Sequence, residues 1–264
     1  MAESTLSLKK RDFEIKLGMY FGHGSGGFAF EDREWTTKEA YKIRDCVESG
    51  LRQFYFPPPL GGVPYDWSFL KPTASLAVVD GDQSINLPDD FGGFEGRITI
   101  SSPTTRTWQP IPLFNEGIIR ELYSKNPERT GPPEAAAVRP IKGTTLSEGT
   151  RSQLMIFPEA DESYTLQFPY YILANCLDGT HPYAYGGMAH AETILESCLA
   201  IAEQRYDNTV GVHSAKFMER LAASIALDRR LKPEAGGLNT DNTDRFVYRH
   251  DIEATVTYNG AAMG

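Results

Sequence analysis

The sequence predicts an α+β fold: a helical bundle built from the N- and C-terminal parts, with an inserted, mainly antiparallel β domain. Apolar residues recur at helical spacing near both ends of the chain. Between them, short β-branched segments alternate with Gly, Asp and Pro turns. This order of elements predicts a helical domain from residues 1–72 and 170–232, a β-rich domain over 73–169, and a C-terminal extension over 233–264.

Two helices are expected in the N-terminal part, on either side of a glycine-rich stretch. The second helix has a clear start, because Thr36 can cap it and Glu39, three residues on, completes a capping box. It should end at the proline run 57–59. The apolar face of the first helix comprises Leu6, Phe13, Leu17 and Tyr20. That of the second comprises Ala40, Ile43, Val47, Leu51 and Phe54.

The middle of the chain predicts one sheet of about five or six short strands. The segments "SLAVVD" and "QSINLP" are separated by "DGD", which is typical of a hairpin turn. "GRITISS", "AAAVRPI", "RSQLMIFP" and "SYTLQFPYY" supply further strands, the last two around the turn "EADE". A short helix is expected over 115–126, with Asn115 as its cap.

Helices return at 187–206 and 211–231, and the chain ends in a polar region that becomes alternating. The expected buried residues of these two helices are Ala191, Ile194, Leu195, Cys198, Ile201, Ala202, Phe217, Leu221, Ala222 and Ile225. In the tail, Ile252, Ala254, Val256 and Tyr258 share one face of a predicted strand.

Charge and cysteine content restrict the function classes. The net charge of −9 argues against a protein that grips nucleic acid by neutralising phosphates. It is compatible with a wall past which DNA slides, although solubility alone explains it more simply. Three cysteines without C-x-x-C spacing argue against a disulfide framework and favour a reducing compartment. Neither an apolar run of about 18 residues nor a signal peptide is visible, so folding in a cytoplasm is expected.

The stretch Gly22–Gly27 matches the spacing of a dinucleotide fingerprint, which raises the alternative of a small hydrolase or nucleotide-binding enzyme. That fingerprint needs a strand before it and a helix directly after it, and the pattern here predicts neither. A hydrolase elbow fails because His23 stands where the first glycine should be relative to Ser25. We interpret the stretch as a flexible connector.

No metal, cofactor or catalytic residue is predicted. The five histidines do not have metal-ligand spacing; they are His23, His181, His190, His213 and His250. The close carboxylates in "DRE", "DGD" and "LPDDF" are typical of turns, where Asp side chains hydrogen-bond to the backbone.

Five segments occur in a distinctive order: "GLRQFYFPP" (50–58), "YDWSFLKP" (65–72), "LPDDF" (87–91), "RSQLMIFPEADESYTLQFPYY" (151–171) and "ERLAASIALDRR" (219–230). This series resembles the head–tail adaptor, or connector, proteins of tailed bacteriophages, which are related to the podophage tail tubular protein A. The resemblance covers roughly residues 5–232 and is carried by the order and spacing of the segments.

The resemblance implies a structural virion protein without enzymatic activity. Such adaptors form a ring, usually of twelve copies, that docks on the portal protein, extends the DNA channel and presents a surface for tail or nozzle proteins. Packaged DNA passes through without specific binding. The expected location is the virion neck, after synthesis in the cytoplasm of a bacterial host. A monomeric binding module is a further alternative.

The terminal extension of such adaptors often reaches toward the portal or a neighbouring copy. Here the tail strand could add to a neighbour's sheet or close the protomer's own sheet. The candidate subunit or portal interface comprises Phe246, Tyr248, Ile252, Val256 and Tyr258.

Overall fold

The computed structural model describes residues 3–23, 34–59, 62, 64–101, 109–142 and 150–231, and the backbone of 257–258 and 261–262. The contacts between residues cluster into two units of the chain, Met1–Leu231 and Lys232–Gly264. No helix in the described part is both long and apolar enough to cross a membrane.

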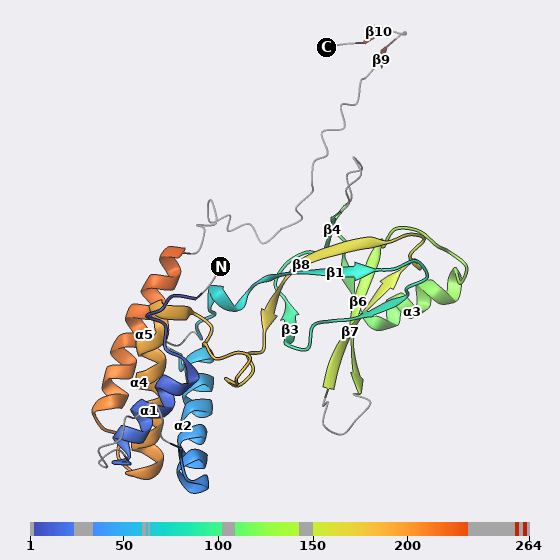
Figure 1. Ribbon diagram of the computed structural model, residues 1–264. Helices are drawn as coiled ribbons and strands as arrows, with labels where there is room; N and C mark the ends of the chain where they lie inside the picture. The colour runs from blue at the N-terminus through green and yellow to red at the C-terminus, as the bar shows by residue number, and fades with distance from the viewer. Residues whose placement is uncertain are drawn as a thin grey trace. The chain divides into compact units, whose positions relative to one another are not determined.

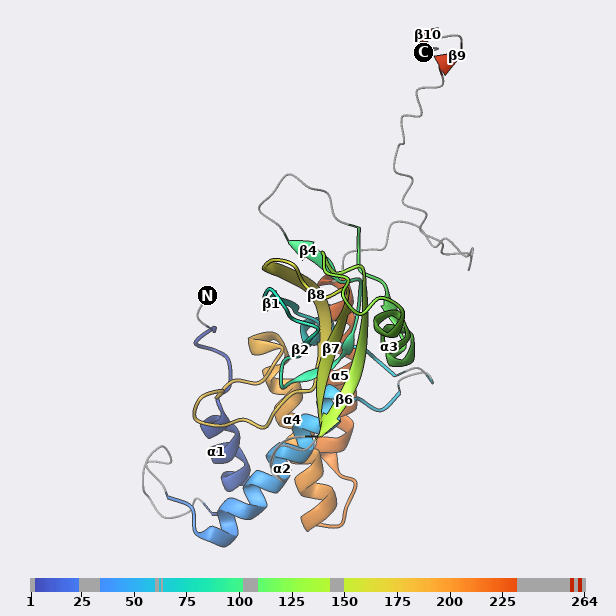
Figure 2. The same cartoon turned by 90° about the vertical axis from the view of Figure 1, so that its right-hand side faces the viewer.

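Four helices of the first unit pack side by side (Figure 1 and Figure 2). They are α1 (Lys10–Tyr20), α2 (Thr37–Tyr55), α4 (Gly187–Tyr206) and α5 (Val212–Leu231). Helix α4 contacts the other three and forms the centre of the group. Its apolar residues and those of its neighbours make one continuous core, together with Trp67 and Leu70 from the segment after α2.

The predicted start of α2 is confirmed. The Thr36 side chain accepts a hydrogen bond from the Glu39 N–H, and the Glu39 carboxylate accepts one from the Thr36 N–H at 2.9 Å. In α1, Phe13 and Leu17 are buried as expected, but Leu6 is exposed. The helix begins only at Lys10, so Leu6 precedes it and does not share its face.

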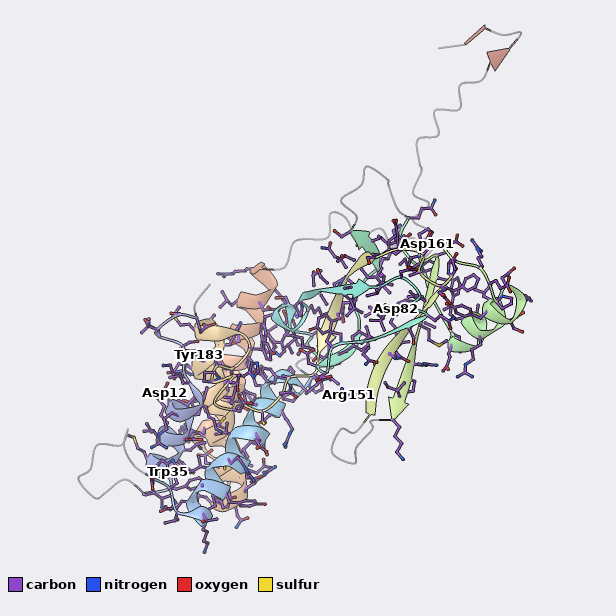
Figure 3. The ribbon with its side chains drawn as sticks, turned by 45° about the vertical axis from the view of Figure 1, so that its right-hand side comes forward. Asp12, Trp35, Asp82, Arg151, Asp161 and Tyr183 are labelled. Atoms are coloured by element: carbon purple, nitrogen blue, oxygen red, sulfur yellow. The ribbon has the colours of Figure 1, made fainter. Side chains whose placement is uncertain are left out.

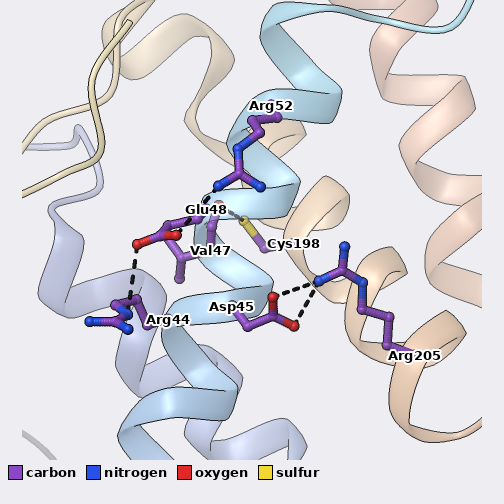
Figure 4. A network of polar contacts seen from close by, with 7 residues as sticks. All are labelled: Arg44, Asp45, Val47, Glu48, Arg52, Cys198 and Arg205. Carbon is purple, nitrogen blue, oxygen red and sulfur yellow. Dashed lines mark hydrogen bonds and ion pairs between the residues drawn. The ribbon is translucent and has the colours of Figure 1, made fainter. Parts of the chain in front are cut away.

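Helices α2 and α4 approach each other closely at a glycine. A Cβ atom at Gly50 would lie 2.6 Å from the Cα atom of Cys198, which is closer than such atoms approach in proteins. The Ser197 hydroxyl also donates a hydrogen bond to the Gly50 carbonyl at 2.9 Å. At the surface of the same pair, Arg205 contacts both carboxylate oxygens of Asp45 at 2.7 Å (Figure 4). Gly50 therefore sets how closely these two helices pack.

The strands of the first unit form two sheets. The first has the order β1–β8–β3, with β4 also paired to β8; the second has the order β2–β7–β6–β5. Their bounds are β1 (Thr73–Val78), β2 (Ser84–Asn86), β3 (Phe91–Phe94), β4 (Thr99–Ser101), β5 (Leu113–Phe114), β6 (Ala135–Lys142), β7 (Thr150–Phe157) and β8 (Tyr164–Ile172). All pairs are antiparallel except β5 with β6.

Two expectations for this region are wrong. The "DGD" turn does not close a hairpin, because β1 pairs with β8 whereas β2 pairs with β7. The strands also form two sheets instead of one. The physical reason is a shared core: side chains from both sheets meet in one apolar cluster that includes Val78, Leu154 and Phe168. The turns after β1 and β7 therefore lead from one sheet to the other.

Helix α3 (Glu116–Lys125) covers a smaller apolar cluster on the second sheet. Its predicted cap is confirmed, since the Asn115 side chain accepts a hydrogen bond from the Gly117 N–H at 2.9 Å. Ile119 is fully buried, and the Tyr123 hydroxyl donates to the Ile156 carbonyl at 2.6 Å.

The α+β class with mainly antiparallel sheets is confirmed. The apolar faces of α4 and α5 also agree with prediction, apart from the partly exposed Ile201 and the exposed Ala222. Ala222 directly follows the buried Leu221 and lies on the solvent side of α5. In the second unit, β9 (Thr257–Tyr258) and β10 (Ala261–Ala262) form a short antiparallel pair.

Candidate functional site

The five segments that carry the resemblance contact one another in a continuous series, although they span most of the first unit. The series begins at the end of α2. There the fully buried Trp67 donates its indole N–H to the Phe54 carbonyl at 2.8 Å, and the two rings lie 4.6 Å apart. This contact joins the segment 50–58 to the segment 65–72.

Asp228 joins the same place to α5. Asp228 is 1% exposed, and its carboxylate accepts hydrogen bonds from the Tyr65 hydroxyl at 2.6 Å, the Ser68 N–H at 3.2 Å and the Ser68 hydroxyl. Burial and the contact with Asp228 raise the pKa of Tyr65, so this hydroxyl remains a donor. A buried carboxylate is stabilised by such donors. The segments 65–72 and 219–230 are thereby fixed to each other.

The β strands complete the series. The Phe56 and Tyr171 rings lie 6.3 Å apart, which connects 50–58 to 151–171. The Tyr170 hydroxyl then donates to Asp90 at 3.1 Å, and the Leu173 N–H donates to the Asp90 carbonyl at 2.8 Å. These contacts connect the segment 87–91 to the end of β8.

An ion-pair bridge lies at the same junction. The Lys71 ammonium is 2.9 Å from Asp66 and 2.8 Å from Glu95, which precedes β4. These two carboxylates raise the pKa of Lys71 against the opposing effect of burial. The Lys71 bridge thus joins the segment after α2 to the residue that follows β3.

His190, on α4, lies in the aromatic cluster at this junction. Its ring centre is 5.2 Å from that of Phe69, 5.3 Å from that of Trp67 and 5.9 Å from that of Phe54. The residue is 2% exposed, and its Nδ1 atom has no hydrogen-bond partner among the described residues. Burial lowers the pKa of His190, with a smaller opposing effect from Asp228. The imidazole is therefore a neutral member of the core.

A second polar group fastens α4 to the start of α5. The Glu203 carboxylate accepts hydrogen bonds from the N–H groups of His213 at 3.1 Å and Ser214 at 3.4 Å. These are free donors of the first turn of α5, so Glu203 acts as a cap from another helix. The His213 ring also contacts Glu196 at 2.7 Å.

The glycine-rich stretch is described only at its beginning. Helix α1, not a strand, precedes Gly22, whose φ of +72° is in the left-handed region. His23 Nδ1 is 3.3 Å from Glu39 at the start of α2. Residues 24–27, including Ser25, lie outside the described residues, so the connector interpretation and the enzyme alternative both stay predictions.

The predicted tail interface is also largely beyond the described part. Phe246, Tyr248, Ile252 and Val256 lie outside it, and only the backbone of Tyr258 is described, opposite Ala261. Among the described histidines, His181 lies in an exposed turn beside Asp178, while His190 and His213 are the contacts given above. His250 lies outside. The described residues contain no group of three or more His, Cys, Asp or Glu side chains arranged to hold a metal ion.

Sequence reasoning missed Asp228 as the residue that joins two of the segments. A signal was present: Leu221, Ile225 and Asp228 follow one another at spacings of four and three, which puts the acid on the buried face of the helix. A carboxylate at such a position requires donors. Searches of protein-family models and of curated proteins found no match to this chain.

Proposed function

We propose that this protein is a structural virion protein: the adaptor ring that joins head to tail in a tailed bacteriophage, without catalysis or cofactor. The proposal rests on the order of the five segments. The single observation that best supports it is their contact series, in which Trp67 and Asp228 join the segment after α2 to α2 and α5, and Tyr170 joins β8 to the turn before β3. A ring subunit that contacts neighbouring copies at fixed positions needs fixed contacts between its own segments.

The use of polar groups favours a scaffold over an enzyme. Asp228 is consumed by internal donors, and Lys71 is held between two carboxylates. A catalytic group would need to face a substrate. The net charge of −9 suits a channel that DNA passes without being held.

Helix α5 offers a face for contact with further copies. One side of it faces the core, while the other is exposed along the whole helix. The exposed side carries small and apolar residues at helical spacing: Ala215, Met218, Ala222 and Ala226. Small residues allow two helices to approach closely, which suits a lateral contact in a ring.

The test is the assembly state of the purified full chain, alone and mixed with the portal protein of the same phage. Sedimentation and negative-stain imaging should reveal a ring of about twelve copies that stacks on the portal. A chain that remains strictly monomeric and also fails to bind portal contradicts the proposal.

The enzyme alternative has its own test. Substituting His23→Ala together with Ser25→Ala should leave assembly intact if the glycine-rich stretch is a connector. Specific capture of a serine-reactive probe or a labelled nucleotide at residues 22–27 would favour the enzyme instead.

A further inference from the structure

A pocket of about 410 Å³ is formed by two loop regions of the first unit. Its walls come from the turn before β3, which supplies Asp89 and Asp90, and from the long loop between β8 and α4. The loop contributes Cys176, Tyr183 and Tyr185. Figure 3 labels Tyr183 on this loop and Arg151 in β7. The volume is in the range of about 300–1,000 Å³ in which proteins bind small groups.

The acidic side of the pocket is only partly neutralised by the protein itself. Asp90 accepts a hydrogen bond from the Tyr170 hydroxyl, but no cation of the described residues pairs with it. Asp89 has Arg151 at 3.5 Å, a long contact on a side chain that is 73% exposed. Among the residues that line the pocket, these two carboxylates are accompanied by one basic side chain, His181, whose Nδ1 atom lies 3.6 Å from Asp178.

The opposite side is aromatic. Burial and, to a lesser extent, the negative charge of Asp90 raise the pKa of Tyr185. The pocket therefore combines the charged Asp90 carboxylate with the protonated hydroxyl of Tyr185. The Tyr183 ring already contacts one cation, since Lys9 Nζ lies 5.8 Å from the ring centre. Leu177 and Pro182 add an apolar lining. Carboxylates facing tyrosine rings match a planar cation, which can form paired hydrogen bonds and stack at once.

A second depression continues from the first. It holds about 250 Å³, shares Asn175 and Cys176 with the pocket, and extends to Glu48 and Arg52 on α2. The combined surface is longer than one side chain, which favours an extended stretch of polypeptide over a free small molecule.

We propose that this pocket binds an arginine side chain on an extended segment of a partner protein, with the guanidinium between Asp90 and the tyrosine rings. The inference does not depend on the proposed function, because it rests on the lining of the pocket alone.

The reaction rate of the Cys176 thiol measures whether the pocket is occupied. It is exposed and lines both depressions, whereas Cys46 and Cys198 are buried. Burial raises the pKa of Cys46 to about 12 and raises that of Cys198 as well. A thiol reagent will therefore report on Cys176 in the native protein, and a bound peptide will slow its reaction.

The experiment measures the rate at which N-ethylmaleimide modifies Cys176 in the full chain at rising concentrations of acetyl-Gly-Arg-Gly-amide. We expect saturable protection below about 10 mM, the range of a weak contact made by a short peptide. Acetyl-Gly-Gln-Gly-amide should protect at least about tenfold less, because the charged, paired hydrogen bonds are lost.

Two variants link protection to the pocket. Asp90→Asn keeps an acceptor for Tyr170 and should weaken protection about tenfold, and Tyr185→Leu should weaken it independently by removing a ring. Asp80→Asn, an exposed acid outside the pocket, is the matched control and should leave protection unchanged. Each variant is first checked for an unchanged circular dichroism spectrum.

Each of the following results would overturn the proposal. The first is no protection by the arginine peptide. The second is equal protection by the glutamine peptide or undiminished protection in both variants. The third is equal protection by free arginine amide, which would assign the pocket to a small ligand instead of a protein segment.

Discussion

Asp228 and Ser68 hold each other through two bonds: the Asp228 carboxylate accepts both the N–H of Ser68, at 3.2 Å, and its hydroxyl. This pair ties the last helix of the first unit to the segment that follows α2. Because the carboxylate is buried, its loss leaves donors without partners, which gives the first prediction.

Replacing Asp228 by alanine should destabilise the protein by roughly 3 kcal/mol, since buried donors on Tyr65 and Ser68 lose their acceptor. Asp228→Asn retains an acceptor and should cost less. The measurement is urea unfolding followed by tryptophan fluorescence. Asp80→Ala, at an exposed turn, should stay within about 0.5 kcal/mol of the parent. An equal loss in both alanine variants would contradict the role of Asp228.

His190 should make stability depend on pH. Its pKa is lowered in the folded protein, so the unfolded chain binds its proton first as pH falls below the ordinary value of 6.5. Stability from this group is therefore present at neutral pH and is lost on acidification, until the folded-state pKa is reached. The slope is limited to about 1.4 kcal/mol per pH unit for one proton.

His190→Phe should remove this part of the pH dependence while keeping an aromatic ring in the cluster. His181→Gln removes a histidine whose side chain is 75% exposed and serves as the control, with an unchanged slope. Denaturation at a series of pH values between about 5 and 7 compares the three proteins. The same slope in the parent and in His190→Phe would refute the assignment.

Gly50 should tolerate no side chain. Alanine there brings a Cβ atom to 2.6 Å from the Cys198 backbone, so α2 and α4 must separate. We expect a loss of about 1–3 kcal/mol, the usual cost of overpacking. Gly93→Ala is a matched control because its Cβ meets nothing within 4 Å. Thermal melting of both variants tests the contrast, and similar melting temperatures would argue against a close helix contact.

The cysteines should differ sharply in reactivity. In the native protein a thiol reagent should modify Cys176 alone, and in urea it should modify all three cysteines. Cys176→Ser should abolish the native reaction. Rapid native modification of Cys46 or Cys198 would mean that the contact between α2 and α4 opens readily.

The parts of the fold that depend on neighbouring residues could be predicted from the sequence. The capping box of Thr36 and Glu39 and the cap at Asn115 were identified correctly because each acts over two or three residues. The strand pairing was not, since β1 and β8 meet across about ninety residues of sequence. Local turn chemistry around "DGD" carries no information on which sheet a strand joins.

The candidate site, too, could be predicted from the sequence only in part. The five segments are visible in the sequence, whereas the contacts between them are not, because Asp228 and Tyr65 become neighbours only when α5 packs on the helices. Ala222 shows the limit of a prediction made from helical spacing. Alanine suits either the buried or the exposed face of a helix, and only the packing of α4 against α5 decides which face of α5 is covered.

The pairing of β1 with β8 also gives the β strands the character of a detachable module. The chain enters them at Thr73, and the last strand β8 passes Thr73 at Pro169, its direct partner in the antiparallel register, before it ends at Ile172. Partners of this kind lie about 5 Å apart, a gap that a short turn can bridge. The sheets could therefore be exchanged for a different domain, or removed, at the cost of one small loop. Such a joint would let the helices keep their packing while the appended part diversifies.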